Sequence, residues 1–452
     1  MSSVLRIKIV NKTPLAWLMW VLILFPFCFG TLNDLLGLPR FVRYFVDAAW
    51  LSAFVVAVSY SPTIKKKWEF LLVMWIGAFF LYTLIVYFVE YQSVFYYLWG
   101  FRNVFRFYIA FFVFSRYLRL EYIERYLDIF DVLFWVNLVA MIFQYFVLDL
   151  EQDFLGGVFG IERGCNGYSN IFFIIVVTKS ILFYLDKRES FTSCGLKCVA
   201  ALLVSALAEL KLFFVEFVII LILTVLISRF TWRKLWVIVG GIAGLCIGVV
   251  LLTTLFPRFA GWFSVEWFLE NAMSEKGYTG HGDLNRLNSI SQINQLWFET
   301  LGNRIFGFGL GNCDTANFSI VNTPFYIQYQ DLHYTWISYA FMYLECGWIG
   351  LIFYFGFFLL CFMEIQRIEK ACYGKFKLYC YLAKIMALFC LLFSIYNNSL
   401  RAESGYMAYF VMAIPFALSY QKSNYIIKQF SNSKMEENVE KIRVINDRTE
   451  NI

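Results

Sequence analysis

Repeated apolar runs restrict this chain of 452 residues to one class of fold more strongly than any other feature. Hydrophobic residues make up 60% of the sequence and charged residues 15%, against roughly 45–50% and about 25% in soluble domains. Many of the runs are about 17–25 residues long, which is the length of a helix that crosses a bilayer. They lack the alternation of a membrane β-barrel. We therefore predict an all-α, polytopic membrane protein.

The apolar runs divide into about twelve predicted spans, with one large loop between the ninth and the tenth. The seventh and eighth spans are short and meet at Glu209-Leu210-Lys211, either as a tight hairpin or as two partly inserted helices. Residues 1–256 would hold spans one to nine, 257–346 the loop with amphipathic helices, 347–420 the last three spans and 421–452 a charged tail. The predicted spans are 15–31, 41–60, 69–89, 100–118, 127–148, 169–186, 195–209, 212–228, 235–256, 347–366, 378–396 and 404–420.

Basic residues between the spans predict the topology, because lysine and arginine concentrate in cytoplasmic loops. With the N-terminus in the cytoplasm, every inside loop is basic, the large loop is extracytoplasmic, and the tail is cytoplasmic. The tail mixes both charges without an apolar pattern, so we expect it to be largely disordered. The inside loops contain Lys65, Lys66, Lys67, Arg116, Arg119, Arg125, Lys187, Arg188, Arg229, Arg233, Lys234, Arg367, Lys370, Lys375 and Lys377.

Other features exclude several functions. The net charge of +6 comes from residues that flank spans, which does not indicate nucleic-acid binding. The eleven cysteines are scattered without a metal-ligand pattern, so we expect no metal or other cofactor. Cys165 and Cys313 are both expected outside, where a disulfide between them is one alternative. The absence of an evident internal repeat argues against transporter folds.

A few charges depart from the inside bias, and ionisable groups at membrane depth are functional candidates. Arg102 and Arg106 share one helix face through their i, i+4 spacing. Lys211 lies beside Glu209 at the outer corner of spans seven and eight. Snorkelling or internal pairing is the alternative interpretation. If they face one external cavity, arginines suit a phosphate or diphosphate, which they bind through two parallel hydrogen bonds. Arg163 and Arg401 also fall in outer segments.

The large loop contains the only two histidines of the chain, His281 and His333. A near-neutral pKa suits histidine to accept a proton from a sugar hydroxyl. We expect His333 to do this, because it stands where the loop meets the membrane. His281 lies in a glycine-rich stretch and is the less favoured catalyst.

The rest of the loop has a helical pattern followed by glycines. Apolar residues from Leu287 to Trp297 have helical spacing, which predicts an amphipathic helix with Arg286 in its first turn. After Arg304, the run Gly307, Gly309, Gly311 predicts a tight turn that lets the backbone approach a neighbour closely. The small residues of the segment from Glu345 through Gly347 to Gly350 indicate a kink where helices approach.

Arg286, Trp297, the run Gly307–Gly311, His333 and Glu345-x-Gly347-x-x-Gly350 stand in an order that resembles the O-antigen polymerase and ligase superfamily. The layout of about twelve spans and one large outer loop resembles it as well, and so do Arg102–Arg106 and the Glu209-Leu-Lys211 corner. Its members include Wzy-type O-antigen and capsule polymerases and WaaL-type ligases. Ligases tend to carry an arginine where this chain has Lys211, which leaves open how a diphosphate is held.

The resemblance implies a GT-C-like architecture and a multi-pass enzyme of the bacterial inner membrane, surrounded by membrane lipids. A glycan on undecaprenyl diphosphate would be transferred to an acceptor hydroxyl in the outer leaflet, without a metal. A flippase and a chain-length regulator would be partners, and nucleic acid would not. Arg286 and Lys211, aided by Arg102 and Arg106, would hold the diphosphate, and His333 would orient or deprotonate the acceptor. Further substrate contacts would be Glu209, Arg304, Gly307, Gly309 and Gly311, and structural roles would fall to Trp297, Glu345, Gly347, Gly350 and Arg401.

Two alternatives to a polymerase remain. A ligase would move the glycan onto lipid A core, and we favour the polymerase because aromatic-rich chains of this kind more often fall in that group. A flippase or other transporter predicts charges deep in mid-span and no large external loop. Asn137 and Gln144 are polar residues in mid-span, but charge at that depth is scarce.

Overall fold

The computed structural model of the chain describes residues 14–60, 63–228, 231–255, 257, 283–315 and 322–421, and within these ranges it contains helices and no strands. A last helix covers 405–421. The others are α1 (Pro14–Leu36), α2 (Tyr44–Tyr60), α3 (Lys67–Val89), α4 (Val94–Tyr117), α5 (Leu120–Phe146), α6 (Asn166–Leu185), α7 (Phe191–Leu207), α8 (Lys211–Ile227), α9 (Arg233–Leu255), α11 (Ser289–Leu296), α12 (Leu301–Phe306), α13 (Pro324–Tyr329), α14 (Ser338–Glu369) and α15 (Lys375–Tyr396).

Eight of the described helical segments are long and apolar enough to cross a membrane. They are α1, Phe41–Ser59 with α2, α3, α5, α6, α9, α14 and α15. The chain is therefore a multi-pass, α-helical membrane protein. The other four predicted spans also fall on helices, namely α4, α7, α8 and 405–421. Three of these have 17 residues, the lower end of the spanning range, and α4 carries arginines. The count of twelve stays a prediction.

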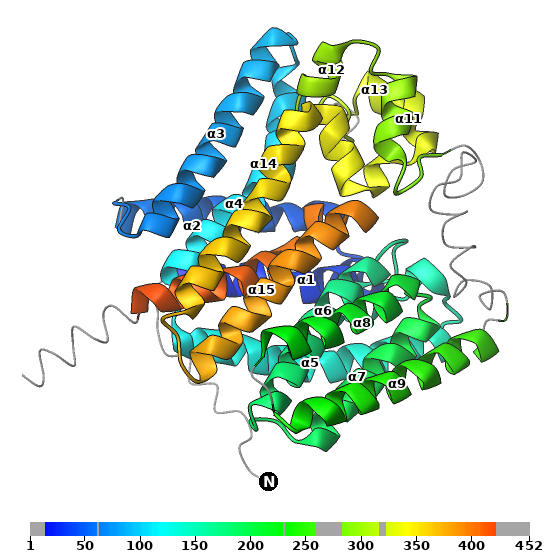
Figure 1. The fold of residues 1–452 in the computed structure, drawn as a ribbon. Helices are drawn as coiled ribbons and strands as arrows, with labels where there is room; N and C mark the ends of the chain where they lie inside the picture. Colours follow the sequence, from blue (N-terminus) through cyan, green and yellow to red (C-terminus); the bar gives the residue numbers. More distant parts are fainter. Residues whose placement is uncertain are drawn as a thin grey trace, which may run out of the picture.

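The long helices pack side by side, and the short helices gather at one corner (Figure 1). α14 packs along α15 and against α3, while α6 contacts α7, α8 and α15. The spanning part of α6 is 89% buried, against 22% for α3 and α9, so α6 lies inside the bundle and the other two at its edge. α11, α12 and α13 lie together beside the N-terminal part of α14.

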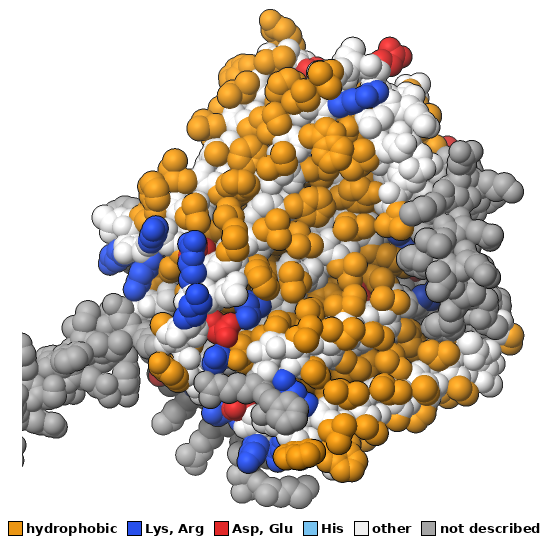
Figure 2. All heavy atoms as spheres, in the orientation of Figure 1, with side chains coloured by type: hydrophobic (Ala, Val, Ile, Leu, Met, Phe, Trp, Pro, Cys, Tyr) orange, Lys and Arg blue, Asp and Glu red, His pale blue; other side chains and the backbone are white. Residues whose placement is uncertain are grey.

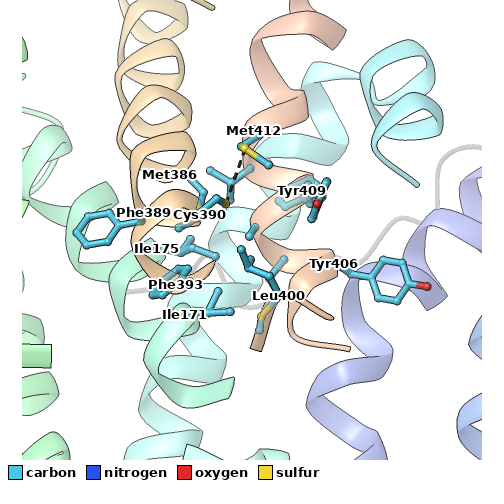
Figure 3. Close-up of a cluster of buried hydrophobic side chains, with 14 of the residues drawn as sticks. Ile171, Ile175, Met386, Phe389, Cys390, Phe393, Leu400, Tyr406, Tyr409 and Met412 are labelled. Atoms are coloured by element: carbon cyan, nitrogen blue, oxygen red, sulfur yellow. Dashed lines mark hydrogen bonds between the residues drawn. The ribbon is translucent and has the colours of Figure 1, made fainter. Parts of the chain in front are cut away.

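The centre of the bundle is built from α6, α15 and the last helix (Figure 3). Bulky apolar side chains interdigitate there, all of them buried. Because lipid tails are as apolar as these side chains, close van der Waals packing, rather than removal from water, holds the helices together. The cluster includes Ile171, Ile175, Met386, Phe389, Cys390, Phe393, Leu400, Tyr409 and Met412.

The two polar mid-span residues hold a backbone segment that enters the bundle between α5 and α6. The Gln144 amide donates to the Gly157 carbonyl (2.9 Å) and accepts from its N–H (2.7 Å). The Asn137 carbonyl oxygen accepts from the Val158 N–H at 2.8 Å. Irregular backbone at membrane depth must find such partners inside the protein. These two amides therefore have a structural use that accounts for their position.

The turn between α7 and α8 is a tight hairpin, one of the two predicted arrangements. Glu209 takes the left-handed conformation (φ 52°), and the Leu210 N–H donates to the Ser205 carbonyl at 2.8 Å. Cys165 and Cys313 are both buried free thiols, so the disulfide alternative is not realised.

The surface of the bundle is mainly apolar on the face that Figure 2 shows, across α14, α15 and α9. Lysine and arginine gather on this face toward the end of the bundle where α14 is joined to α15. This distribution agrees with a lipid-facing belt bordered by a basic edge.

Reporter fusions test the predicted topology and the one polar span. With α4 crossing, alkaline phosphatase fused after Arg163 or Thr300 is expected to be active, and green fluorescent protein fused after Lys187 or Gln421 is expected to fluoresce. All four fusion points follow α4, so if α4 does not cross, the sides of all four fusions reverse. A silent phosphatase after Thr300 would contradict an external loop.

Candidate functional site

Two distant parts of the predicted loop are joined beside the C-terminal end of α15, at Tyr396. The Leu284 N–H donates to the Leu332 carbonyl at 3.0 Å, which places Asp283 next to His333 and Arg286 two residues beyond the paired Leu284. The predicted helix is shorter than expected and begins at Ser289, so Arg286 lies in the turn before it rather than in its first turn. The pairing with Leu332 accounts for this difference, because it fixes the preceding segment in a non-helical conformation.

His333 is held in front of a buried carboxylate. Its Nδ1 lies 3.7 Å from Asp283 Oδ2, with the histidine side chain 32% exposed and the aspartate 1% exposed. The imidazole ring packs on Trp336, with 3.8 Å between ring centroids, and the backbone of His333 is left-handed (φ 52°). At 3.7 Å the two atoms make no hydrogen bond, but a carboxylate at this distance favours a protonated imidazole and leaves the other nitrogen for a substrate.

Arg286 lies at the end of α15, next to this pair. Its guanidinium is 3.9 Å from the centroid of the Tyr396 ring, and its carbonyl accepts a hydrogen bond from the Tyr339 hydroxyl. The Tyr396 ring thus holds the cation, and the Tyr339 hydroxyl holds the backbone of the turn. The structure thus brings together the two residues that the sequence assigned to catalysis.

A chain of contacts leads from His333 to the corner between α7 and α8. The Arg163 guanidinium lies 5.3 Å from the Trp336 ring and 4.0 Å from Asp153. Asn166 donates to Asp153 (3.1 Å) and to the Ala208 carbonyl (3.4 Å). Glu209 and Lys211 follow directly, so this corner lies at the same end of the bundle as His333.

Arg102 and Arg106 share a face as predicted, but the protein's own carboxylates take up their charge. Arg102 donates twice to Asp47 Oδ2, at 3.0 and 2.7 Å. Arg106 is 2% exposed and pairs with Glu403 at 3.3 Å and with Asp47 at 3.7 Å. It also donates to the Arg401 carbonyl at 2.8 Å. A direct contact of Arg106 with a diphosphate would require these pairs to open.

Arg401 extends this set of charges to the loop and to α14. Its guanidinium lies 3.3 Å from Asp314, 3.8 Å from Glu345 and 3.8 Å from the centroid of the Phe341 ring. Asn103, next to Arg102 in α4, donates to Asp314 at 2.7 Å. We call the connected charges the arginine–carboxylate network, which consists of Asp47, Arg102, Arg106, Asp314, Glu345, Arg401 and Glu403.

Electrostatics within the network favour the ionised state of Glu403. Burial alone would raise its pKa, but Arg106, Arg43 and Arg102 together hold the pKa at about 2, below its ordinary 4.5. Tyr168 donates to the same carboxylate at 3.3 Å. Glu403 therefore keeps its negative charge at any physiological pH.

The predicted kink of α14 lies at Gly347, where φ is 58° and the helix is interrupted. The carbonyls of Leu344 and Glu345 turn to the loop and accept from the N–H groups of Phe308 (3.0 Å) and Gly309 (2.8 Å). An interrupted helix leaves such carbonyls without a partner of its own. The loop supplies the donors that α14 lacks.

The glycines of the loop approach the protein's own backbone. A Cβ at Gly311 would lie 1.9 Å from the Tyr96 carbonyl oxygen, and one at Gly307 would lie 2.5 Å from the Glu345 carbonyl carbon. The Gly311 N–H also donates to Glu345 Oε1 at 2.9 Å. This packing confirms the predicted close approach, while a contact of these glycines with substrate stays a prediction. Gly350 likewise packs closely, against the Cys346 side chain.

Trp297 and Arg304 complete the predicted set. The Trp297 ring packs against Phe325, Tyr329 and Tyr334, with centroids 5.0, 5.2 and 6.2 Å away, so it anchors α13 to the loop. Arg304 donates to the Phe298 carbonyl at 3.2 Å. His281 lies outside the described residues, as does Arg258.

Sequence reasoning missed the acidic partners in the site. Asp283, Asp47, Asp314 and Glu403 were not singled out, although each stands near a predicted basic residue in space. A buried arginine needs a counter-charge, and this requirement could have prompted a search for the acids. No group of three or more metal-ligating side chains occurs among the described residues.

Comparisons with known proteins add no family to this picture. No known family model matches the chain, and no curated protein matches it either.

Removal of one member of the arginine–carboxylate network should destabilise the fold. Arg106→Gln leaves Glu403 and Asp47 without their buried partner, so we expect a loss of about 3–5 kcal/mol, measured by thermal or denaturant unfolding in detergent. Arg163→Gln is the control, because its pair with Asp153 is exposed, and exposed pairs contribute roughly 0–1 kcal/mol. Equal stability of the two variants would refute a structural role for the network.

Substitution of Gly311 should be far more damaging than that of a glycine with free space around it. Gly311→Ala places a methyl group on the Tyr96 carbonyl in a left-handed backbone (φ 88°), whose conformational cost alone is roughly 1–2 kcal/mol. Gly77→Ala in α3 meets no atom within 4 Å and should raise stability slightly. Melting temperatures of the two purified variants check this, and a stable Gly311→Ala protein would contradict it.

Proposed function

We propose that the chain polymerises oligosaccharide repeat units carried on undecaprenyl diphosphate, at the outer face of the bacterial cytoplasmic membrane. The product would be an O-antigen, a capsule or an exopolysaccharide. One observation carries the proposal: the Leu284–Leu332 pairing brings His333, with buried Asp283 behind it, to the segment whose Arg286 lies over Tyr396 at the C-terminal end of α15. A base and a fixed cation side by side suit transfer of a sugar from an anionic leaving group.

His333 would serve the acceptor sugar. The acceptor oxygen attacks the anomeric carbon of the donor while its proton passes to the imidazole nitrogen that faces away from Asp283. The buried carboxylate stabilises the imidazolium that forms. Trp336 keeps the ring in one orientation, so the base needs no reorganisation during the reaction.

Arg286 would serve the departing diphosphate. As the bond from the anomeric carbon to the diphosphate oxygen breaks, the electron pair leaves with the lipid diphosphate, which gains negative charge. A guanidinium that is already fixed over Tyr396 can bind this charge in two parallel hydrogen bonds. Lys211, at the same end of the bundle, would hold the second phosphate as a point charge.

A variant series in a strain that lacks the chromosomal gene tests the proposal. His333→Ala, Arg286→Ala and Lys211→Ala should each abolish long glycan chains on a polysaccharide gel while the protein still inserts into the membrane. His281→Ala and Glu299→Gln, in the same loop, should retain the ladder. Full-length polymer in all three site variants would sink the proposal.

The same experiment separates the polymerase from a ligase. A polymerase variant that fails leaves single repeat units attached to the lipid A core, whereas a failed ligase leaves finished chains on undecaprenyl diphosphate. The lipid on which the glycan accumulates therefore decides between the two enzymes.

A second candidate function is transport of the lipid-linked glycan, which one buried residue favours. Glu216 in α8 is 0% exposed and faces Asn170 without a well-formed hydrogen bond, and intramembrane carboxylates often mark transport pathways. Reconstituted vesicles loaded with lipid-linked oligosaccharide distinguish the two: a transporter would move the lipid across the bilayer, and a polymerase would lengthen its glycan.

A further inference from the structure

A charged cavity of about 540 Å³ opens between the ends of α5, α6, α7 and α15. It is not part of the candidate site, and its lining is dominated by ionisable side chains. Four cations and three carboxylates line it, and two more carboxylates, Glu124 and Asp186, pair with cations at the rim. The residues used in the argument are Asp128, Asp131, Lys179, Arg188, Lys197 and Lys375.

Two buried lysines form the inner wall of the cavity. The side chains of Lys179 and Lys197 are 5% and 6% exposed. Asp131 bridges them, with one oxygen 2.5 Å from Lys179 and the other 3.0 Å from Lys197. Lys179 also donates to the Leu127 carbonyl at 2.8 Å, and Lys197 lies 2.9 Å from Glu189. The two ion pairs offset the desolvation free energy of the buried ammonium groups, and they fix both groups at one place.

The cations of the cavity retain unused hydrogen-bond donors. An ammonium group has three protons, and the contacts above use two on each lysine. At the rim, Lys375 pairs with Glu124 at 2.7 Å, and Arg188 binds Asp186 through Nε at 2.6 Å. Within the described residues, the terminal nitrogens of Arg188 make no hydrogen bond. The cavity therefore offers convergent N–H groups in the arrangement that phosphate oxygens bind.

The cavity opens at the opposite end of the bundle from His333 and Arg286. Lys375 begins α15 and Tyr396, under Arg286, ends it. At 1.5 Å per residue these ends are about 32 Å apart, which is about the thickness of the hydrocarbon layer. The same holds in α6, where Tyr168 reaches Glu403 near one end and Lys179 lies near the other. A ligand of the cavity would thus come from the other side of the membrane.

We propose that this cavity binds a phosphate group, carried either by a lipid headgroup of that leaflet or by a soluble phosphate ester. Buried cations with spare donors and a guanidinium fork at the rim both favour a phosphoanion. The volume exceeds the need of a phosphate alone and lies in the range of small-molecule sites. Asp131 and Glu189 are engaged by the lysines, so they neutralise the wall without blocking the rim.

Binding of defined probes to the purified full chain in a phosphate-free maltoside detergent tests the proposal. Thermal unfolding and equilibrium titration are followed with inorganic phosphate in one arm and with phosphatidylglycerol mixed micelles in the other. The wild type should be stabilised in a saturable manner in at least one arm. Saturation by inorganic phosphate identifies a soluble ligand, and saturation by the lipid alone identifies a headgroup.

Rim variants are the informative ones, because loss of Lys179 or Lys197 would break a buried bridge. Arg188→Gln/Lys375→Gln removes two charge-assisted contacts and should weaken binding about tenfold or more, with the unliganded melting temperature nearly unchanged. Lys375→Gln alone should show a smaller loss in the same direction. Arg367→Gln is the control, since this residue is 64% exposed near the end of α14 and does not line the cavity. No binding in either arm, or equal binding by wild type and double variant, would overturn the proposal.

Discussion

The buried arginines Arg106 and Arg401 meet their counter-charges within the protein, and the part of the fold around the loop depends on these pairs. Arg106 and Arg401 are almost without exposed surface, and the carboxylates that neutralise them come from α2, the loop, α14 and the segment before the last helix. Helices in a bilayer gain no stability from moving apolar surface out of water, so packing and polar contacts hold them together. The arginine–carboxylate network, whose Arg102 and Arg106 stand in α4, therefore joins five parts of the chain where an unpaired buried charge would be very costly.

The helices could be predicted from the sequence because the membrane acts on local composition. Each predicted span falls on a helix, and the polar turn at Glu209 separates α7 from α8 where the apolar runs break. Composition could not predict which helices are central. α6 is nearly enclosed while α3 is mostly exposed, although both runs are apolar enough to cross a membrane. Burial of this kind is set by contacts between distant segments, and hydrophobicity alone does not encode them.

The basic residues of the candidate site could be predicted from the sequence, but their acidic partners could not, because those pairs also depend on contacts between distant segments. Arg286 and His333 stood out because basic residues are rare in so apolar a chain, and the structure places them together. Asp283 carried no such signal, since one aspartate in a polar loop is ordinary until Leu284 pairs with Leu332 and sets it behind the imidazole. Arg106 was recognisable as unusual. Its ion pair with Glu403 could not be predicted, because the two residues are almost three hundred positions apart and no local sequence pattern links them.

The interruption of α14 at Gly347 has a mechanical consequence. The carbonyls of Leu344 and Glu345 accept hydrogen bonds from Phe308 and Gly309. The part of α14 before Gly347 and the glycine loop therefore form one rigid piece. His333 and Trp336 lead directly into this part of α14. A substrate that displaced the loop would therefore turn the first turns of α14 with it, about a pivot at Gly347. The part of α14 after Gly347, which packs along α15, would stay in place.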